Sequence, residues 1–287
     1  MKTQIFFPSA ELRSVVQRYE FFHFDNEQPL PGSFLFLPSF VNGLLFNFYQ
    51  GQPALLSNDK IVKHQVQGEN LVSSVTRPAE LSRICQTTSI RVIFHPGALA
   101  ALFDKPMGAF VNQSLSLSES LDRELYHLWQ RLGNELQLKT QLSMIEAYLK
   151  KRLASIKRFY SLYPVLDQHF QQSGYQMGVA QLARKIGVGE RDLNRKLNKQ
   201  LGIPMTRFIS IHRFNTAVRQ LQHNPVTPLT DLAYQLDYSD QPHFNREFKR
   251  LSGMTPGQFR KGIRQGKLLL PKLGDEIHGT GALFKRA

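Results

Sequence analysis

The sequence of 287 residues lacks features that would place it in several common protein classes. It holds a single cysteine, Cys85, which excludes an intrachain disulfide framework and a zinc finger built from several cysteines. Its apolar runs are all shorter than the roughly 18 residues that a membrane-spanning helix needs. Residues 1–8 lack the apolar stretch of a signal peptide. We therefore expect a globular, cytoplasmic protein without a membrane partner.

Acidic residues are also scarce. The chain has 22 Asp and Glu against 36 Lys and Arg, which gives a formal net charge of +14. The excess is concentrated, because residues 156–264 contain seventeen basic and seven acidic side chains. Such a charge favours an acidic partner, either nucleic acid or an anionic membrane, but it does not define a fold.

Hydrophobic spacing in the first third of the chain is typical of β-structure. Residues 34–37, 43–49 and 89–94 are short runs of aromatic and aliphatic side chains that end at or near Pro or Gly. Runs of this length and composition favour strands. We predict that residues 1–95 are mostly β.

Helical spacing dominates the rest. Apolar residues predict a short helix at 98–103 and a leucine-rich pair of helices over 119–153 that is interrupted near Gly133. Length alone favours two domains. We predict an α+β multidomain protein composed of a β-rich N-terminal domain with accessory helices (1–155), an all-α domain with two helix-turn-helix units and a linking helix (156–265), and a flexible tail (266–287).

A helix, a glycine turn and a second helix are predicted over residues 179–201. Gly187 can adopt the positive φ that such a turn requires. Leu193, Leu197 and Leu201 recur every four residues and mark the buried face of the second helix. The opposite face of that helix carries Arg191, Arg195 and Asn198, with Asn194 and Lys199 at its flanks. A helix of this kind can lie in a DNA major groove, where Arg reads guanine and Asn reads adenine.

The same arrangement recurs about fifty residues later. Residues 229–236 form the first helix, and Ser239 or Asp240 can cap the second. Phe244 and Phe248 point inward in that second helix. The outward side and its flanks carry Gln241, His243, Asn245, Arg246, Lys249 and Arg250. Residues 205–223 between the two units predict one long linking helix.

The stretch 231–250 and its continuation through Thr255-Pro256 and Phe259-Arg260 resemble the signature of the AraC/XylS family of transcriptional regulators. The resemblance covers about 100 residues and includes Gly202 in the first unit. Two positions depart from the family pattern, namely Asp237 where Gly is usual and Gly189 where Ser is usual. Asp tolerates left-handed φ better than most residues, so the second turn should be retained.

The resemblance implies that both second helices enter successive major-groove segments on one face of a duplex. We expect base-edge contacts from Arg191, Asn194, Arg195, Gln241, His243, Asn245 and Arg246. We expect phosphate contacts, which position the protein without reading sequence, from Lys199, Ser239, Lys249 and Arg250.

In this family the N-terminal part senses a ligand, mediates dimerisation, or both. An anionic small-molecule effector could be held by Arg77 or Arg91, although each could equally be a surface or structural arginine. The leucine stripe over 119–153 could be buried on a second subunit, as in a homodimer, or on its own sheet. An activator would also contact RNA polymerase, and a DNA-bound regulator would be associated with the nucleoid.

Other functions remain as alternatives. An enzyme is disfavoured, because the sequence has no P-loop, nucleophile elbow or zinc-binding helix, and we predict no catalytic residue, cofactor or metal. A metal-dependent oxygenase would need His23, His64 and His95 to converge with a carboxylate such as Asp25. We predict a transcriptional regulator that binds double-stranded DNA at specific sequences. The family resemblance favours an activator. The main alternative is a non-specific or architectural DNA-binding protein.

Overall fold

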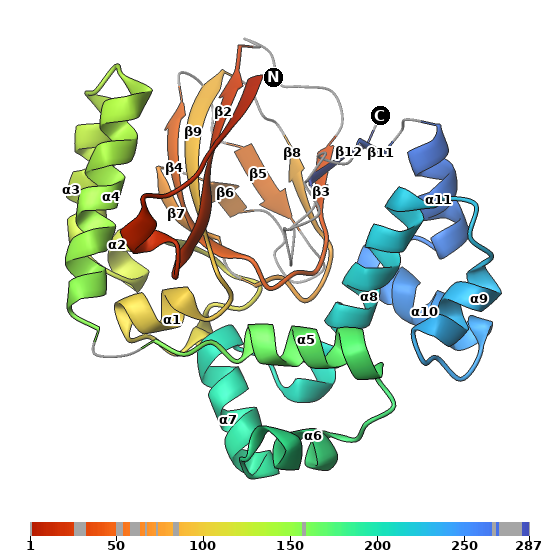
Figure 1. Cartoon of the computed structure of the whole chain (residues 1–287). Coiled ribbons are helices and arrows are strands. Elements are labelled where there is room, and N and C mark those ends of the chain that lie inside the picture. The colour runs from red at the N-terminus through yellow and green to blue at the C-terminus, as the bar shows by residue number, and fades with distance from the viewer. Residues whose placement is uncertain are drawn as a thin grey trace.

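The computed structural model describes residues 2–25, 33–49, 54–57, 64–66, 68–72, 74–82, 86–156, 159–265, 268–269 and 283–286. Within these ranges the N-terminal part is β-rich and the C-terminal part is helical (Figure 1). The predicted fold class, a β-rich domain with accessory helices followed by an all-α domain, is confirmed.

Antiparallel strands form two sheets in the described part of the chain. The first has the order β1 (Lys2–Phe6), β2 (Val16–Phe24), β9 (Thr87–Phe94), β4 (Asn42–Tyr49), β7 (Glu69–Val72) and β10 (Ser114–Ser116). The second has the order β11 (Leu268–Leu269), β12 (Leu283–Arg286), β3 (Ser33–Phe36), β8 (Ala79–Ser82), β5 (Ala54–Ser57) and β6 (His64–Val66). The runs predicted as strands are therefore β3, β4 and β9.

Helices cover one face of the first sheet, with α3 and α4 along its side (Figure 1). The accessory helices are α1 (Ala98–Phe103), α2 (Leu117–Ser120), α3 (Glu124–Gly133) and α4 (Leu138–Ala154), with short 3-10 turns η1 (Ala10–Leu12) and η2 (Met107–Ala109). Alternate residues of β9, Ile90 and Val92, share one buried cluster with Leu125, Leu128 and Leu149 of the helix pair. Most of the leucine stripe is thus buried against its own sheet, whereas Leu136 is 97% exposed.

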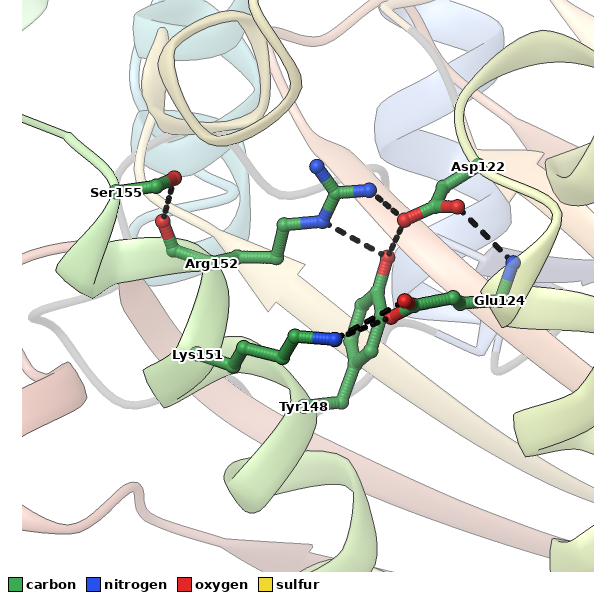
Figure 2. A network of polar contacts seen from close by, with 6 residues as sticks. All are labelled: Asp122, Glu124, Tyr148, Lys151, Arg152 and Ser155. Atoms are coloured by element: carbon green, nitrogen blue, oxygen red, sulfur yellow. Dashed lines mark hydrogen bonds and ion pairs between the residues drawn. The ribbon is translucent and has the colours of Figure 1, made fainter.

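Polar side chains join the start of α3 to the end of α4 (Figure 2). The Tyr148 hydroxyl donates to Asp122 Oδ2 at 3.0 Å, and Arg152 forms an ion pair with the same oxygen. Lys151 pairs with Glu124 at 3.0 Å. The Asp122 side chain is 14% exposed, whereas that of Glu124 is 53% exposed. The Asp122 contacts are therefore the better shielded from water.

Asp122→Ala should lower the free energy of unfolding of the N-terminal domain by about 1.5–3 kcal/mol, because it leaves a half-buried arginine and a tyrosine without their charged acceptor. Glu124→Ala is the control, and should cost about 0–1 kcal/mol because its ion pair is solvent-screened. Denaturant unfolding followed by fluorescence of Trp129, the one tryptophan in the sequence, reports on this domain. Equal losses in the two variants would contradict the prediction.

The C-terminal helices share a second core. They are α5 (Tyr163–Ser173), α6 (Val179–Ile186), α7 (Glu190–Leu201), α8 (Met205–His223), α9 (Leu229–Gln235), α10 (Gln241–Ser252) and α11 (Pro256–Arg264). This core also includes Leu35, Leu37 and Phe40 from the N-terminal part. The Phe40 ring stacks on Phe208 of α8 with centroids 4.5 Å apart. The two domains therefore meet through apolar contacts as well as through the chain, while the boundaries at 155 and 265 stay predictions.

Part of the predicted flexible tail forms strands. Strand β12 pairs antiparallel with β3, with Leu283 opposite Phe36, and β11 pairs with β12. An open sheet edge carries unpaired backbone groups that accept another strand. The flexibility of the tail stays a prediction. The rest of the tail lies outside the described residues. No described helix combines the length and the hydropathy required to cross a bilayer.

Candidate nucleic-acid interface

Helices α6 and α7 form the first helix-turn-helix unit. Leu182 of α6 packs in the same core as Leu193 and Leu197 of α7, and all three are buried. Gly187 ends α6 with φ +77°, and the Val188 amide donates to the Ala183 carbonyl at 3.0 Å. The turn has the left-handed residue that the sequence predicted.

Cations occupy the exposed side of α7. Arg191 and Arg195 are exposed, as predicted for base-reading side chains. Lys196 is also exposed and lies 2.9 Å from Asp192, which pairs with Arg195 as well. Hydrogen bonds from Lys196 and Arg195 lower the pKa of the Asp192 carboxyl, so this group stays ionised near neutral pH. Lys196 was not among the predicted contacts, although its position beside Arg195 could have indicated it.

Two other predicted contacts in this helix have partners within the chain. Asn194 Oδ1 accepts from the Met205 amide at 3.1 Å, and its Nδ2 donates to the Glu190 carbonyl at 3.2 Å. Asn194 therefore holds the start of α8. Lys199 Nζ lies 3.4 Å from Asp104 Oδ1 of the N-terminal domain. Asn194 is partly buried, whereas Lys199 is 61% exposed and stays accessible from outside.

Helices α9 and α10 form the second unit. Asp237 takes φ +56° in its turn, as the sequence predicted for a residue that replaces Gly. Of the two possible caps it is Asp240 that acts, because its Oδ1 accepts from the His243 amide at 2.6 Å. Phe244 and Phe248 are buried, and their rings lie 5.7 Å apart. The inward face of α10 is thus fixed by aromatic packing.

The outward side of α10 presents Arg246 and Lys249, both exposed. His243 is 44% exposed beside them, with its Nδ1 3.3 Å from Ser239 Oγ. Gln241 lies at the start of the helix and accepts a hydrogen bond from Thr230 at 2.8 Å. Arg246 and Lys249 are therefore accessible on the outward side of this helix, with His243 partly exposed beside them.

The remaining predicted contacts of α10 lie closer to the protein. Asn245 is half-buried, and its Oδ1 is enclosed without a hydrogen-bond partner among the described residues. Arg250 is exposed but donates to Ser210 Oγ of α8 at 3.0 Å and lies 3.6 Å from Glu247. Ser239 donates to Asp240 at 3.3 Å. These three residues stay predicted DNA contacts. For Arg250 and Ser239, DNA would have to replace the hydrogen bonds that they form within the chain.

The arginines predicted to hold an effector differ in their surroundings. Arg91 is buried and donates from Nε to Glu20 Oε2 at 2.7 Å and from Nη2 to the same oxygen. Arg18 donates to the other oxygen of Glu20 at 2.7 Å. Arg91 thus has a structural partner, while Arg77 is half-exposed. In the described ranges, no three His, Cys, Asp or Glu side chains are grouped so that they could hold a metal ion.

Comparison with known proteins places the helical part in a family. Residues 182–262 match the family described as "Helix-turn-helix domain". This span begins in α6 and ends in α11, so that it contains both units and α8. It is an AraC-type helix-turn-helix domain. The resemblance noted in the sequence is confirmed for this region.

The curated relatives match through the AraC-type domain. The chain is 29% identical to the HTH-type transcriptional activator RhaS of Escherichia coli over 108 residues, which cover 38% of this chain and 37% of RhaS. It is 28% identical over 89 residues to the uncharacterized HTH-type transcriptional regulator YtdP of Bacillus subtilis, which is 11% of that protein. The chain therefore spans about a third or less of these relatives.

Solved structures resemble the chain at lower identity. ToxT from Vibrio cholerae covers 88% of this chain and 98% of its own, with 11% identity and a TM-score of 0.45. The C-terminal domain of the response regulator yesN from Fusobacterium nucleatum covers 35% of this chain and 99% of its own, with 24% identity and a TM-score of 0.31.

Proposed function

We propose that the chain is a transcriptional regulator that binds double-stranded DNA at specific sequences. The observation that carries the proposal is that α7 and α10 each bury an apolar side and expose arginines on the other. Helices of this kind enter the major groove, where an arginine donates two hydrogen bonds to guanine O6 and N7. The net charge of +14 adds attraction to phosphates.

Each unit would contact its own segment of the major groove. Arg191 and Arg195 would read one major-groove segment, and His243 and Arg246 the next, roughly 34 Å along the duplex. Lys249, exposed on the flank of α10, would contact phosphate and so fix the register without reading bases.

Activation is supported by the similarity to RhaS, which is itself named an activator. An activator requires contact with RNA polymerase, and we place the protein in the cytoplasm, at the nucleoid when bound. We assign to the N-terminal domain the sensing of a small-molecule effector, the formation of a homodimer, or both. Most of the leucine stripe packs on its own sheet, so a homodimer would have to use other surfaces as well. We propose no enzymatic role.

Arg246→Ala and Lys249→Ala should have different effects on DNA binding. A preferred site is first selected from a random library, and both variants are then titrated against that site and random DNA at several salt concentrations. Arg246→Ala should cost about 1–3 kcal/mol on the selected site and little on random DNA. Lys249→Ala should weaken both alike and reduce the salt slope by about one. Equal losses for both variants on both DNAs would refute this division.

A non-specific or architectural DNA-binding protein is the alternative. Such a protein would bind through charge and DNA shape, with little preference among sequences. Competition between the selected site and genomic fragments separates the two cases, because only a sequence-specific regulator discriminates by orders of magnitude.

A further inference from the structure

The carboxylate of Asp237 is bonded outside its own helix-turn-helix unit. Its Oδ2 accepts from the Tyr175 amide at 2.6 Å, and its Oδ1 accepts from Gln176 Nε2 at 2.9 Å. Asp237 lies in the turn of the second unit, whereas residues 174–176 lie between α5 and α6, directly before the first unit. One side chain therefore joins segments of the chain that are 62 residues apart.

The linking helix α8 contributes to the same junction. The Arg213 guanidinium lies 5.0 Å from the centre of the Tyr175 ring and 5.2 Å from that of Tyr238. The Tyr175 hydroxyl is 2.6 Å from His212 Nδ1, so the residue that Asp237 binds is itself held by α8. We call Asp237, Tyr238, Tyr175, Arg213 and His212 the interunit clamp.

The turn of the second unit does not itself require an aspartate. Its backbone requires a residue that tolerates φ +56°, and Gly adopts this conformation more easily than Asp. What Asp adds is an acceptor with two oxygens, and both are bonded to the segment directly before the other unit. Gly174 fits this role, because a Cβ there would lie 2.8 Å from Asp237 Oδ2.

We propose that Asp237 is a positioning residue that fixes α7 and α10 relative to each other and so selects DNA sites with one spacing between their two half-sites. The proposal rests on the proposed function for its DNA consequence. Without the clamp carboxylate, the units are joined mainly by α8 and its core contacts, and rotation about that helix meets less resistance. A charge-assisted pair of hydrogen bonds away from the helix axis opposes such rotation.

The clamp is tested first without DNA, in the full-length chain. Spin labels are placed at Gln181 of α6 and Gln235 of α9, both exposed, in a Cys85→Ser background, and distances are measured by pulsed EPR. Asp237→Gly keeps the left-handed turn and removes both acceptors, so the distance distribution should broaden. Asp231→Asn is the control, because it removes the same charge from an exposed position in α9, and its distribution should equal that of the parent. A parental distribution in Asp237→Gly overturns the clamp.

The second test measures DNA spacing. The selected site is compared with versions that have one base pair added or removed between the half-sites. Asp237→Gly should bind the native spacing about tenfold more weakly than the parent and should discriminate less among the three spacings. Asp231→Asn should behave as the parent. An equal loss by Asp237→Gly on all three DNAs overturns the role in spacing.

Two further outcomes are distinguishable. If the parent protein does not prefer the selected site over random DNA, the proposed function fails, while the EPR measurement still decides whether the clamp exists. If Asp237→Gly does not fold, Asp237→Asn replaces it, because Asn also tolerates left-handed φ but its amide has only one accepting oxygen. That variant should show intermediate broadening, and a parental distribution would overturn the proposal.

Discussion

Glu20→Gln should lower the free energy of unfolding of the N-terminal domain by about 3–5 kcal/mol at neutral pH. Glu20 lies on β2 opposite Arg91 of β9 and accepts hydrogen bonds from both Arg91 and Arg18, with all three side chains almost fully buried. A neutral amide would leave two buried guanidinium groups without a counter-charge. Trp129 fluorescence in denaturant titrations measures the loss. Glu11→Gln is the control, since Glu11 is 68% exposed in its pair with Lys150 and should cost at most about 1 kcal/mol.

The stability that Glu20 contributes should also depend on pH. Burial by itself would raise the pKa of Glu20, but attraction to Arg91 and Arg18 outweighs it, and the net pKa is lowered. A carboxyl with a lowered folded pKa stabilises the protein above its unfolded pKa of about 4.3, and this contribution is lost as pH falls further towards the folded pKa. The difference between parent and Glu20→Gln should therefore be constant near neutrality and shrink below about pH 4. A difference that grows with acidity would contradict the role of Glu20.

Gly202→Ala should lower the stability of the C-terminal domain by about 2–5 kcal/mol. Gly202 follows α7 with φ +76°, a conformation that costs other residues about 1–2 kcal/mol. A Cβ there would also lie 2.4 Å from Val111 and 2.6 Å from the Met107 carbonyl oxygen, and overpacking adds about 1–3 kcal/mol. Both contacts belong to the N-terminal domain. Far-ultraviolet circular dichroism during unfolding measures the change.

Gly187→Ala is the matched control for Gly202→Ala. Gly187 has nearly the same φ, +77°, but a Cβ there meets nothing within 4 Å. Gly187→Ala should therefore lower the stability only by the cost of the left-handed conformation, about 1–2 kcal/mol. Equal losses in the two variants would show that the end of α7 does not pack against residues 107–111 in solution.

Local patterns in the sequence predicted the helical domain well. Leucines at four-residue intervals predicted α7. The apolar spacing over 205–223 predicted α8 with the ends that the structure shows. A turn needs a particular φ at one residue, so Gly187 and Asp237 could be recognised from residue type alone. Exposure of Arg191, Arg195 and Arg246 followed from the same helical periodicity.

Contacts between distant segments could not be predicted in this way. Periodicity places Asn194 at the flank of the outer face of α7, but only the packed structure shows that its amide oxygen accepts a hydrogen bond from the start of α8. Likewise, Lys199 and Asp104 are paired across two domains, at positions 95 residues apart. Asp237, which stands where the family usually has Gly, was the one sequence signal for the clamp. The sequence alone does not show which residues pack against this aspartate.

The central claim, that α7 and α10 read neighbouring turns of one duplex, is tested most directly by hydroxyl-radical footprinting on the selected site. We expect two protected segments on one face, about one helical turn of 10 base pairs apart. Arg195→Ala should weaken protection of one segment and Arg246→Ala that of the other. A single protected segment, or protection that neither variant changes, would contradict the claim.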